Sequence, residues 1–137
     1  IGVITSHLLK MDVGHSGLTK MVEVKTIAER KSLMMEEADA FIAMPGGFGT
    51  LDELFDIAAL NQLRIMDKPV AIYNVKHYFD GLLAWFDNGV KEGFIRAEHR
   101  DNIIVFDNPE SIIEKLSQFK PVTIGKWISN LNKFSNS

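Results

Sequence analysis

Short apolar runs alternate along this chain with longer segments in which apolar positions recur at helical spacing. Several of the runs are apolar on both faces, which is typical of central strands in a parallel sheet. We expect strands at Ile1–Thr5, Met21–Lys25, Ala40–Met44, Pro69–Tyr73 and Ile103–Phe106. We expect helices at Thr26–Ala38, Thr50–Arg64, Phe79–Glu92 and Pro109–Phe119. This alternation predicts an α/β fold, in which right-handed crossovers place helices on both faces of a doubly wound parallel sheet.

Several helix boundaries carry recognisable sequence signals. These are S/T-x-x-E capping boxes at Thr26–Glu29 and Thr50–Glu53, an N-cap at Asn108 before Pro109, and a helix end at Gly93. The segment from His7 to Gly17 contains glycines and polar residues without periodicity, so we expect a loop there.

The two ends of the chain depart from the alternating pattern. Ile1–Thr5 already reads as a buried strand. We therefore expect this chain to be a piece of a longer protein, with an N-terminal βα segment missing from the piece. We expect one domain over residues 1–120 and a C-terminal extension over 121–137. In that extension Trp127, Ile128 and Leu131 would form a docking helix, and Phe134–Ser137 would fray.

Composition narrows the range of functions. The net charge of −3 over 137 residues supplies no general attraction for nucleic acid or for an anionic membrane. No apolar run approaches the roughly 20 residues that span a bilayer, so a cytoplasmic location is expected. The chain has no cysteine. Its four histidines are isolated, so we expect no metal site; they are His7, His15, His77 and His99.

The loop Pro45–Thr50 has the sequence Pro-Gly-Gly-Phe-Gly-Thr and lies between an expected strand and an expected helix. Three glycines leave backbone N–H groups accessible, and the helix N-terminus adds unpaired donors and a positive dipole end. A tight turn would explain one glycine, whereas this arrangement favours a phosphate site. Two common nucleotide motifs do not fit, because a P-loop needs a lysine between Gly49 and Thr50, and G-x-G-x-x-G needs a glycine at Asp52.

Glu53 and Arg30 are the candidate reactive residues. Alone, Glu53 could complete a capping box and Arg30 could be a solvated helix charge. Both are expected in the first turn of a helix that follows a parallel strand, and those strands are consecutive. Both side chains are then expected at the carboxyl edge of the sheet, where open α/β folds bind ligands. A carboxylate and a cation beside a phosphate cradle could cleave a nucleotide.

These motifs resemble the LONELY GUY (LOG) family, whose hallmark is PGGxGTxxE with an upstream Arg-Lys pair. Members are cytokinin riboside 5′-monophosphate phosphoribohydrolases, and many bacterial ones once carried the label of possible lysine decarboxylase. The resemblance runs from about Ile1 to Phe119. It is carried by Glu29-Arg30-Lys31, by Pro45 to Glu53, by Gln62, by Lys68-Pro69-Val70 and by Glu92-Gly93-Phe94-Ile95.

The resemblance implies a Rossmann-like fold, a homodimer, and release of a free base and ribose 5-phosphate from an AMP-like nucleotide without a cofactor. Arg30 and Glu53 match the family's catalytic pair. The nucleotide-binding set comprises Lys31, Gly46, Gly47, Phe48, Gly49, Thr50, Leu51 and Asp52. Two departures, Ile27-Ala28 for Met-His and Ala59-Leu60 for Thr-Trp, lie outside the phosphate loop and put the base preference in doubt. A third is that this sequence does not include the family's first strands or its upstream glycine-rich loop, which helps to bind the nucleotide.

Two other functions remain open. The main alternative is a nucleotide-binding carrier or sensor similar to molybdenum-cofactor carrier proteins, with the same loop and no chemistry. A pyridoxal-phosphate decarboxylase has little support, because nothing marks Lys31 or Lys68 as a Schiff-base residue. A homodimer is implied by the family, and an apolar interface could come from Met34, Met35, Leu60 and Leu63.

Overall fold

The computed structural model describes residues 1–11 and 13–122, which form two compact units, Ile1–Asp39 and Ala40 onward. The expected docking helix around Trp127, Ile128 and Leu131, and the expected fraying of Phe134–Ser137, lie outside the described residues. The expectation of one domain over residues 1–120 stays a prediction.

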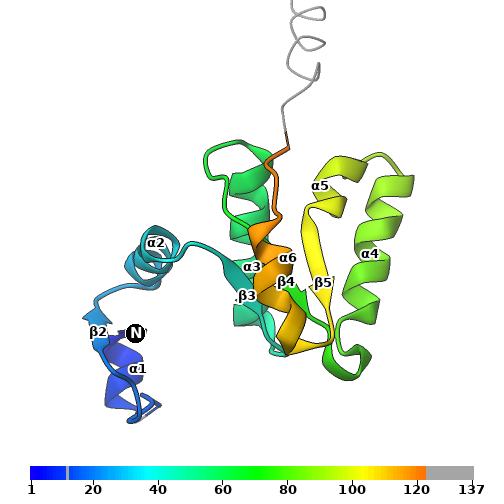
Figure 1. The fold of residues 1–137 in the computed structure, drawn as a ribbon. Helices are drawn as coiled ribbons and strands as arrows, with labels where there is room; N and C mark the ends of the chain where they lie inside the picture. Colours follow the sequence, from blue (N-terminus) through cyan, green and yellow to red (C-terminus); the bar gives the residue numbers. More distant parts are fainter. Residues whose placement is uncertain (12, 123–137) are drawn as a thin grey trace, which may run out of the picture. The chain divides into compact units, whose positions relative to one another are not determined.

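The first unit contains a two-stranded parallel sheet, with β1 at Gly2–Thr5 and β2 at Met21–Val24 (Figure 1). Helix α1 (Ser6–Lys10) follows β1, and helix α2 (Ile27–Glu37) follows β2. The expectation of a loop from His7 to Gly17 is therefore wrong at its start. The short helix α1 begins directly after Thr5, whose side chain accepts a hydrogen bond from the N–H of Leu8.

A side-chain cap fixes the start of α2. The Thr26 hydroxyl accepts from the N–H of Glu29 at 3.1 Å, and the Glu29 carboxylate accepts from the N–H of Lys25 at 2.8 Å. The predicted capping box at Thr26 is thus confirmed, with Glu29 bonded to the residue before the N-cap. This cap sets the position of Arg30, the fourth residue of α2.

The second unit is built on a three-stranded parallel sheet in the order β3-β4-β5. Its strands are β3 (Phe41–Ala43), β4 (Val70–Tyr73) and β5 (Ile103–Phe106). Its helices are α3 (Phe48–Gln62), α4 (Asp80–Lys91), α5 (Ala97–Asp101) and α6 (Ile112–Ser117), with 3₁₀ turns η1 (Val75–His77) and η2 (Pro109–Ser111). Asn108 caps η2 as predicted, because its side chain accepts from the N–H of Glu110.

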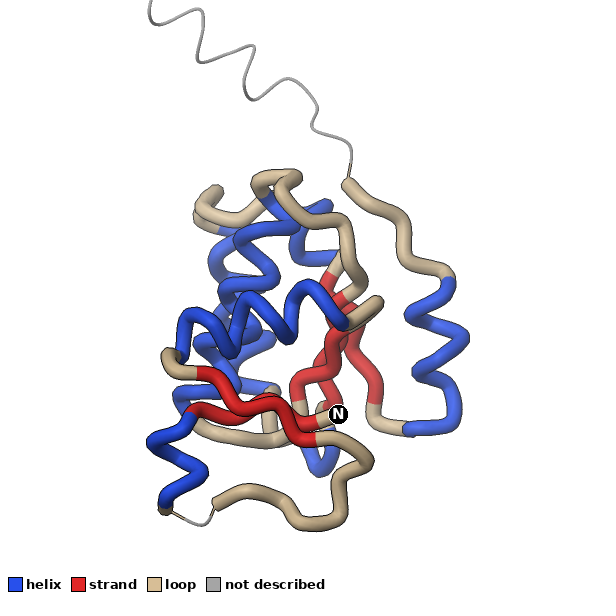
Figure 2. Tube along the Cα trace, turned by 90° about the vertical axis from the view of Figure 1, so that its left-hand side faces the viewer, coloured by secondary structure: helices blue, strands red, loops and turns tan. Residues whose placement is uncertain are grey.

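The two faces of this sheet pack against different helices, because successive strand residues point to opposite sides. Ala71 and Phe106 form a buried cluster with Ile112 of α6. Val70 and Ile103 are paired with each other and point to the opposite face of the sheet. There they line a cavity together with side chains of α3, α4 and α5. Figure 2 shows helix on each side of these strands. The predicted α/β class, with parallel strands and helices on both faces, is therefore confirmed.

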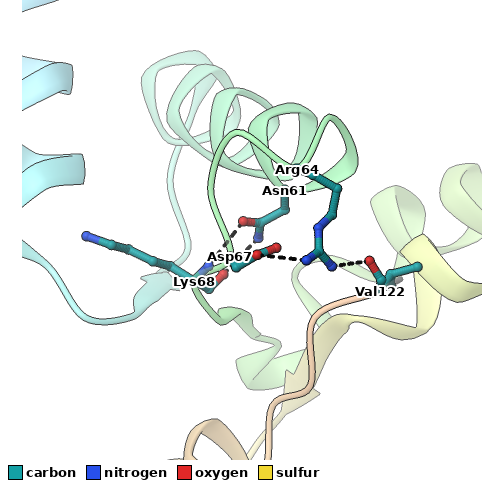
Figure 3. A network of polar contacts seen from close by, with 5 residues as sticks. All are labelled: Asn61, Arg64, Asp67, Lys68 and Val122. Carbon is teal, nitrogen blue, oxygen red and sulfur yellow. Dashed lines mark hydrogen bonds and ion pairs between the residues drawn. The ribbon is translucent and has the colours of Figure 1, made fainter. Parts of the chain in front are cut away.

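The connection from α3 to β4 is held by a small polar network (Figure 3). The Asn61 side chain donates to the carbonyl of Lys68 at 2.8 Å and accepts from its N–H at 3.2 Å. Arg64, which has a left-handed backbone with φ of 59°, pairs with Asp67 at 3.1 Å and donates to the carbonyl of Val122. These bonds fix the end of α3 and so help to hold the helix that carries the candidate site.

Candidate phosphate and nucleotide site

The predicted phosphate loop joins the end of β3 to α3. Helix α3 begins at Phe48 with Gly47 as its N-cap, and no side chain of the described residues caps it. The first helical bond runs from the N–H of Leu51 to the carbonyl of Gly47 at 3.2 Å. The N–H groups of Phe48, Gly49 and Thr50 therefore have no carbonyl one turn back to bind. With the positive end of the helix dipole, they form a site suited to an anion.

The capping box expected at Thr50 and Glu53 is wrong, because α3 begins two residues before Thr50. Thr50 instead lies inside the first turn, with its hydroxyl against the backbone of Gly46. A β-carbon on Gly46 would lie only 2.2 Å from the Oγ1 atom of Thr50, so this close approach requires glycine. Thr50 thus packs the loop onto the helix, and Glu53 moves from the expected first turn to the second.

The other two glycines of the loop are not required by packing within the described chain. A β-carbon on Gly47 or Gly49 would meet no described atom within 4 Å, and Gly47 has a φ of −98°, which other residues adopt. Glycine inside a helix costs about 0.5–1 kcal/mol relative to alanine. Gly49 therefore carries a cost in helix stability that packing within the described chain does not explain, and a ligand that approaches the backbone closely would account for it.

Glu53 lies one turn beyond this bare surface. Residues four apart are neighbours on a helix, and helical side chains lean toward the N-terminus, so Glu53 extends over the turn that contains Gly49. The next residue, Leu54, is 2% exposed and holds α3 on the sheet, while Glu53 itself is half-buried. A molecule whose phosphate occupied the helix start would thus lie close to the Glu53 carboxylate.

The remaining predicted residues of the loop differ in exposure. Phe48, the first residue of α3, is 94% exposed, so its ring makes little contact with the described chain. Asp52 is also exposed, and Leu51 is half-buried. Asp52 lies one turn beyond Phe48, so the two share one side of the helix. Their assignment to nucleotide binding stays a prediction.

Arg30 and Lys31 belong to the first unit, where both are half-buried on α2. The Nε of Arg30 donates to the carbonyl of Val3 in β1 at 3.0 Å, which fixes the guanidinium against that sheet. Glu53 belongs to the second unit. The pairing of Arg30 with Glu53, and the part of Lys31 in nucleotide binding, therefore stay predictions.

Tyr78 lies beside the loop, although no sequence signal points to it. Its hydroxyl donates to the carbonyl of Gly46 at 2.9 Å, across 32 residues of sequence. Tyr78 follows the 3₁₀ turn after β4, in which Lys76 and His77 have left-handed backbones with φ of 51° and 61°. No motif or spacing pairs a tyrosine in this turn with a glycine after β3, because their proximity depends on the neighbouring positions of the two strands.

A separate cavity of about 250 Å³ lies in the second unit between α3, α4, α5 and the sheet. Ala59 and Gln62, which the family resemblance had singled out, line it. Phe55 contacts both Trp85 and Phe86 edge to face there, at 6.1 and 5.9 Å between ring centroids. No residue of the loop from Pro45 to Thr50 lines this cavity. The candidate phosphate site at the start of α3 is therefore separate from this apolar cavity.

His99 of α5 also lines the cavity, and its environment disfavours a positive charge. Burial lowers the pKa of the imidazole below the ordinary 6.5, the nearby Arg96 lowers it further, and Glu98 opposes them. Among the described residues, no group of three histidines or carboxylates is placed to hold a metal ion. None of the described helices is long and apolar enough to cross a membrane.

Comparison with known proteins decides the family. The model of the family described as "Possible lysine decarboxylase" matches residues 1–116. The chain belongs to this family, the LOG family. The rice protein named "Probable cytokinin riboside 5'-monophosphate phosphoribohydrolase LOG4" is 46% identical over 118 residues, which are 86% of this chain and 51% of that protein. The Arabidopsis thaliana protein named "Cytokinin riboside 5'-monophosphate phosphoribohydrolase LOG5" is 37% identical over 125 residues, 91% and 55% of the two chains.

These comparisons confirm the predicted membership of the LOG family. The chain spans about half the length of the curated relatives that it matches. What those relatives are named for is therefore carried over to this chain only as a proposal.

Proposed function

We propose that this protein hydrolyses the N-glycosidic bond of an adenosine 5′-monophosphate, with or without an N6 substituent, to the free base and ribose 5-phosphate. The observation that carries the proposal is the uncapped start of α3, with two glycines that internal packing does not require and Glu53 one turn further on. The printed names of the relatives, cytokinin riboside 5′-monophosphate phosphoribohydrolases, support it.

In this proposal the amides at the start of α3 hold the 5′-phosphate, together with the Thr50 side chain. As the base departs, positive charge develops on the ribose, and the carboxylate of Glu53 stabilises that charge or positions the attacking water. Arg30 orients the phosphate or ribose or assists the departing base, and Lys31 binds beside it. Water supplies the hydroxyl group on the ribose and the proton on the base, so no cofactor is needed.

The family and the composition also support proposals about assembly, location and the class of ligand. The protein acts as a homodimer, and it is cytoplasmic, in keeping with a cysteine-free sequence. Its ligand is a small nucleotide rather than nucleic acid, since the net charge of −3 gives no general attraction for a polyanion.

The test compares the wild-type protein with its Glu53→Gln variant, which has nearly the same size and no negative charge. The 137-residue chain and a version with any natural upstream residues would be incubated with AMP and with N6-isopentenyl-AMP, and the free base measured by chromatography. We expect wild-type protein to release base and Glu53→Gln to be slower by about 100-fold or more. Nucleotide binding without release of base would instead indicate a carrier or sensor.

A further inference from the structure

The loop that would hold the phosphate accepts a hydrogen bond from a side chain far away in the sequence. The peptide between Gly46 and Gly47 lies between two residues without side chains, which leave backbone torsions least restricted. The Tyr78 hydroxyl donates to the carbonyl of that peptide at 2.9 Å. Tyr78 is 57% exposed, so water could satisfy its hydroxyl and burial does not force the bond.

This bond determines the direction of a backbone donor. In a trans peptide the carbonyl and the following N–H point in opposite directions, and the described chain has no cis peptide. With the Gly46 carbonyl directed at Tyr78, the N–H of Gly47 faces the other way. Gly47 is the N-cap of α3, so its N–H lies beside the unpaired amides of the first turn.

The turn that carries Tyr78 is itself held in place. The Asn74 side chain accepts from the N–H of Phe79 at 2.7 Å and donates to Asp80 at 2.7 Å. Phe79 is 3% exposed and anchors the turn, and its ring meets that of Tyr78 at 4.9 Å and 90°. Left-handed backbones at consecutive non-glycine residues, as in this turn, persist where surrounding contacts enforce them, and they cluster at functional sites.

We propose that Tyr78 is a positioning residue for phosphate binding, whose hydroxyl orients the Gly46–Gly47 peptide so that the Gly47 N–H joins the amides at the start of α3. The inference rests on the proposed function, because it assigns a phosphate to that helix start. A donor that is already oriented loses less conformational entropy on binding than one that the ligand must turn into place. Tyr78 therefore acts on the phosphate part of a ligand and not on its base.

The test uses Tyr78→Phe, which removes one oxygen and keeps the ring against Phe79. Tyr73→Phe is a matched control, because Tyr73 is the chain's other tyrosine and its ring stacks on Phe106, on the α6 side of the sheet. Calorimetry would measure the affinity of each protein for AMP and for adenosine, which lacks the phosphate. Assays of base release would give kcat and KM, and thermal melts would check folding.

We expect Tyr78→Phe to bind AMP about three- to tenfold more weakly, the loss of one hydrogen bond, with unchanged affinity for adenosine and a rise in KM larger than any fall in kcat. Tyr73→Phe should bind AMP like the wild type. Equal AMP affinity in Tyr78→Phe and wild type would overturn the inference, as would an equal loss for adenosine. Wild-type protein that binds AMP and releases no base would overturn the proposed reaction alone, since the binding comparison still decides the role of Tyr78.

Discussion

At the scale of single residues, the glycines of the loop differ in whether packing within the described chain requires them. Gly49 lies inside α3, and a β-carbon there would meet no described atom within 4 Å. We predict that Gly49→Ala raises the free energy of unfolding by about 0.5–1 kcal/mol, because alanine is the better helix former. The added methyl group would also cover the amides, so AMP affinity should fall by about tenfold or more. Chemical denaturation and calorimetry would measure the two effects.

Gly46→Ala is the matched control for that prediction. Its β-carbon would lie 2.2 Å from the Oγ1 atom of Thr50, so the first turn would have to shift. We expect this variant to lose stability and affinity together. If Gly49→Ala bound AMP as well as the wild type, the helix start would not be the phosphate site.

The loop could be predicted from sequence because its evidence is local: three glycines between a strand and a helix require no knowledge of tertiary contacts. The prediction that Thr50 is a helix N-cap is wrong, because it too rests on local sequence alone. A threonine three residues before a glutamate satisfies the capping pattern, yet the helix begins at Phe48. Tyr78 was missed because its bond to Gly46 joins residues 32 positions apart.

At the scale of elements, the turn after β4 holds backbone strain that a single substitution should release. Lys76 has a φ of 51°, a conformation that costs a non-glycine residue on the order of 1–2 kcal/mol. We predict that Lys76→Gly stabilises the protein by up to about 1 kcal/mol, since the greater freedom of glycine in the unfolded chain offsets part of the gain. Lys76→Ala removes the same charge and keeps the β-carbon, so it should give no such gain in thermal melts.

Helix α5 should make stability depend on pH through His99. Burial, with help from Arg96, lowers the pKa of His99 in the folded protein below the 6.5 of an ordinary histidine. Between these two values the unfolded chain binds a proton that the folded chain does not, so this contribution to stability is full above pH 6.5 and falls as the pH drops through the folded pKa. We expect His99→Gln to melt with a weaker dependence on pH in this window. An identical slope for both proteins would contradict the assignment.

The predictability of the elements follows their length and hydrophobicity. The strand Ile103–Phe106 matches its predicted bounds, because four consecutive apolar residues are bounded by polar ones. The long helices are found to within two residues at most ends. Helices α1 and α5, with five residues each, were not predicted, since a segment of that length is too short to display a helical period.

At the scale of the whole molecule, the candidate catalytic residues are divided between two compact units of the chain. Arg30 lies in the first compact unit and Glu53 in the second, and the chain spans about half the length of its curated relatives. Sequence could suggest their pairing only through the order of the strands and the family motif. Because the proposed reaction uses a residue from each unit, we expect assembly of the protein and its activity to be linked.

The proposed homodimer makes that link testable. Leu63, in the set expected at the interface, is 63% exposed, and Ile65 nearby is 70% exposed. Exposed apolar side chains that lie close together are typical of interaction surfaces. We predict a dimer by light scattering at micromolar concentration, and a monomer with Leu63→Glu. Ile113→Glu on α6 is the control, because Ile113 is also exposed, at 72%, and lies outside the expected interface. A wild-type monomer would contradict the dimer. A Leu63→Glu monomer that kept full activity would show that each chain contains a complete site.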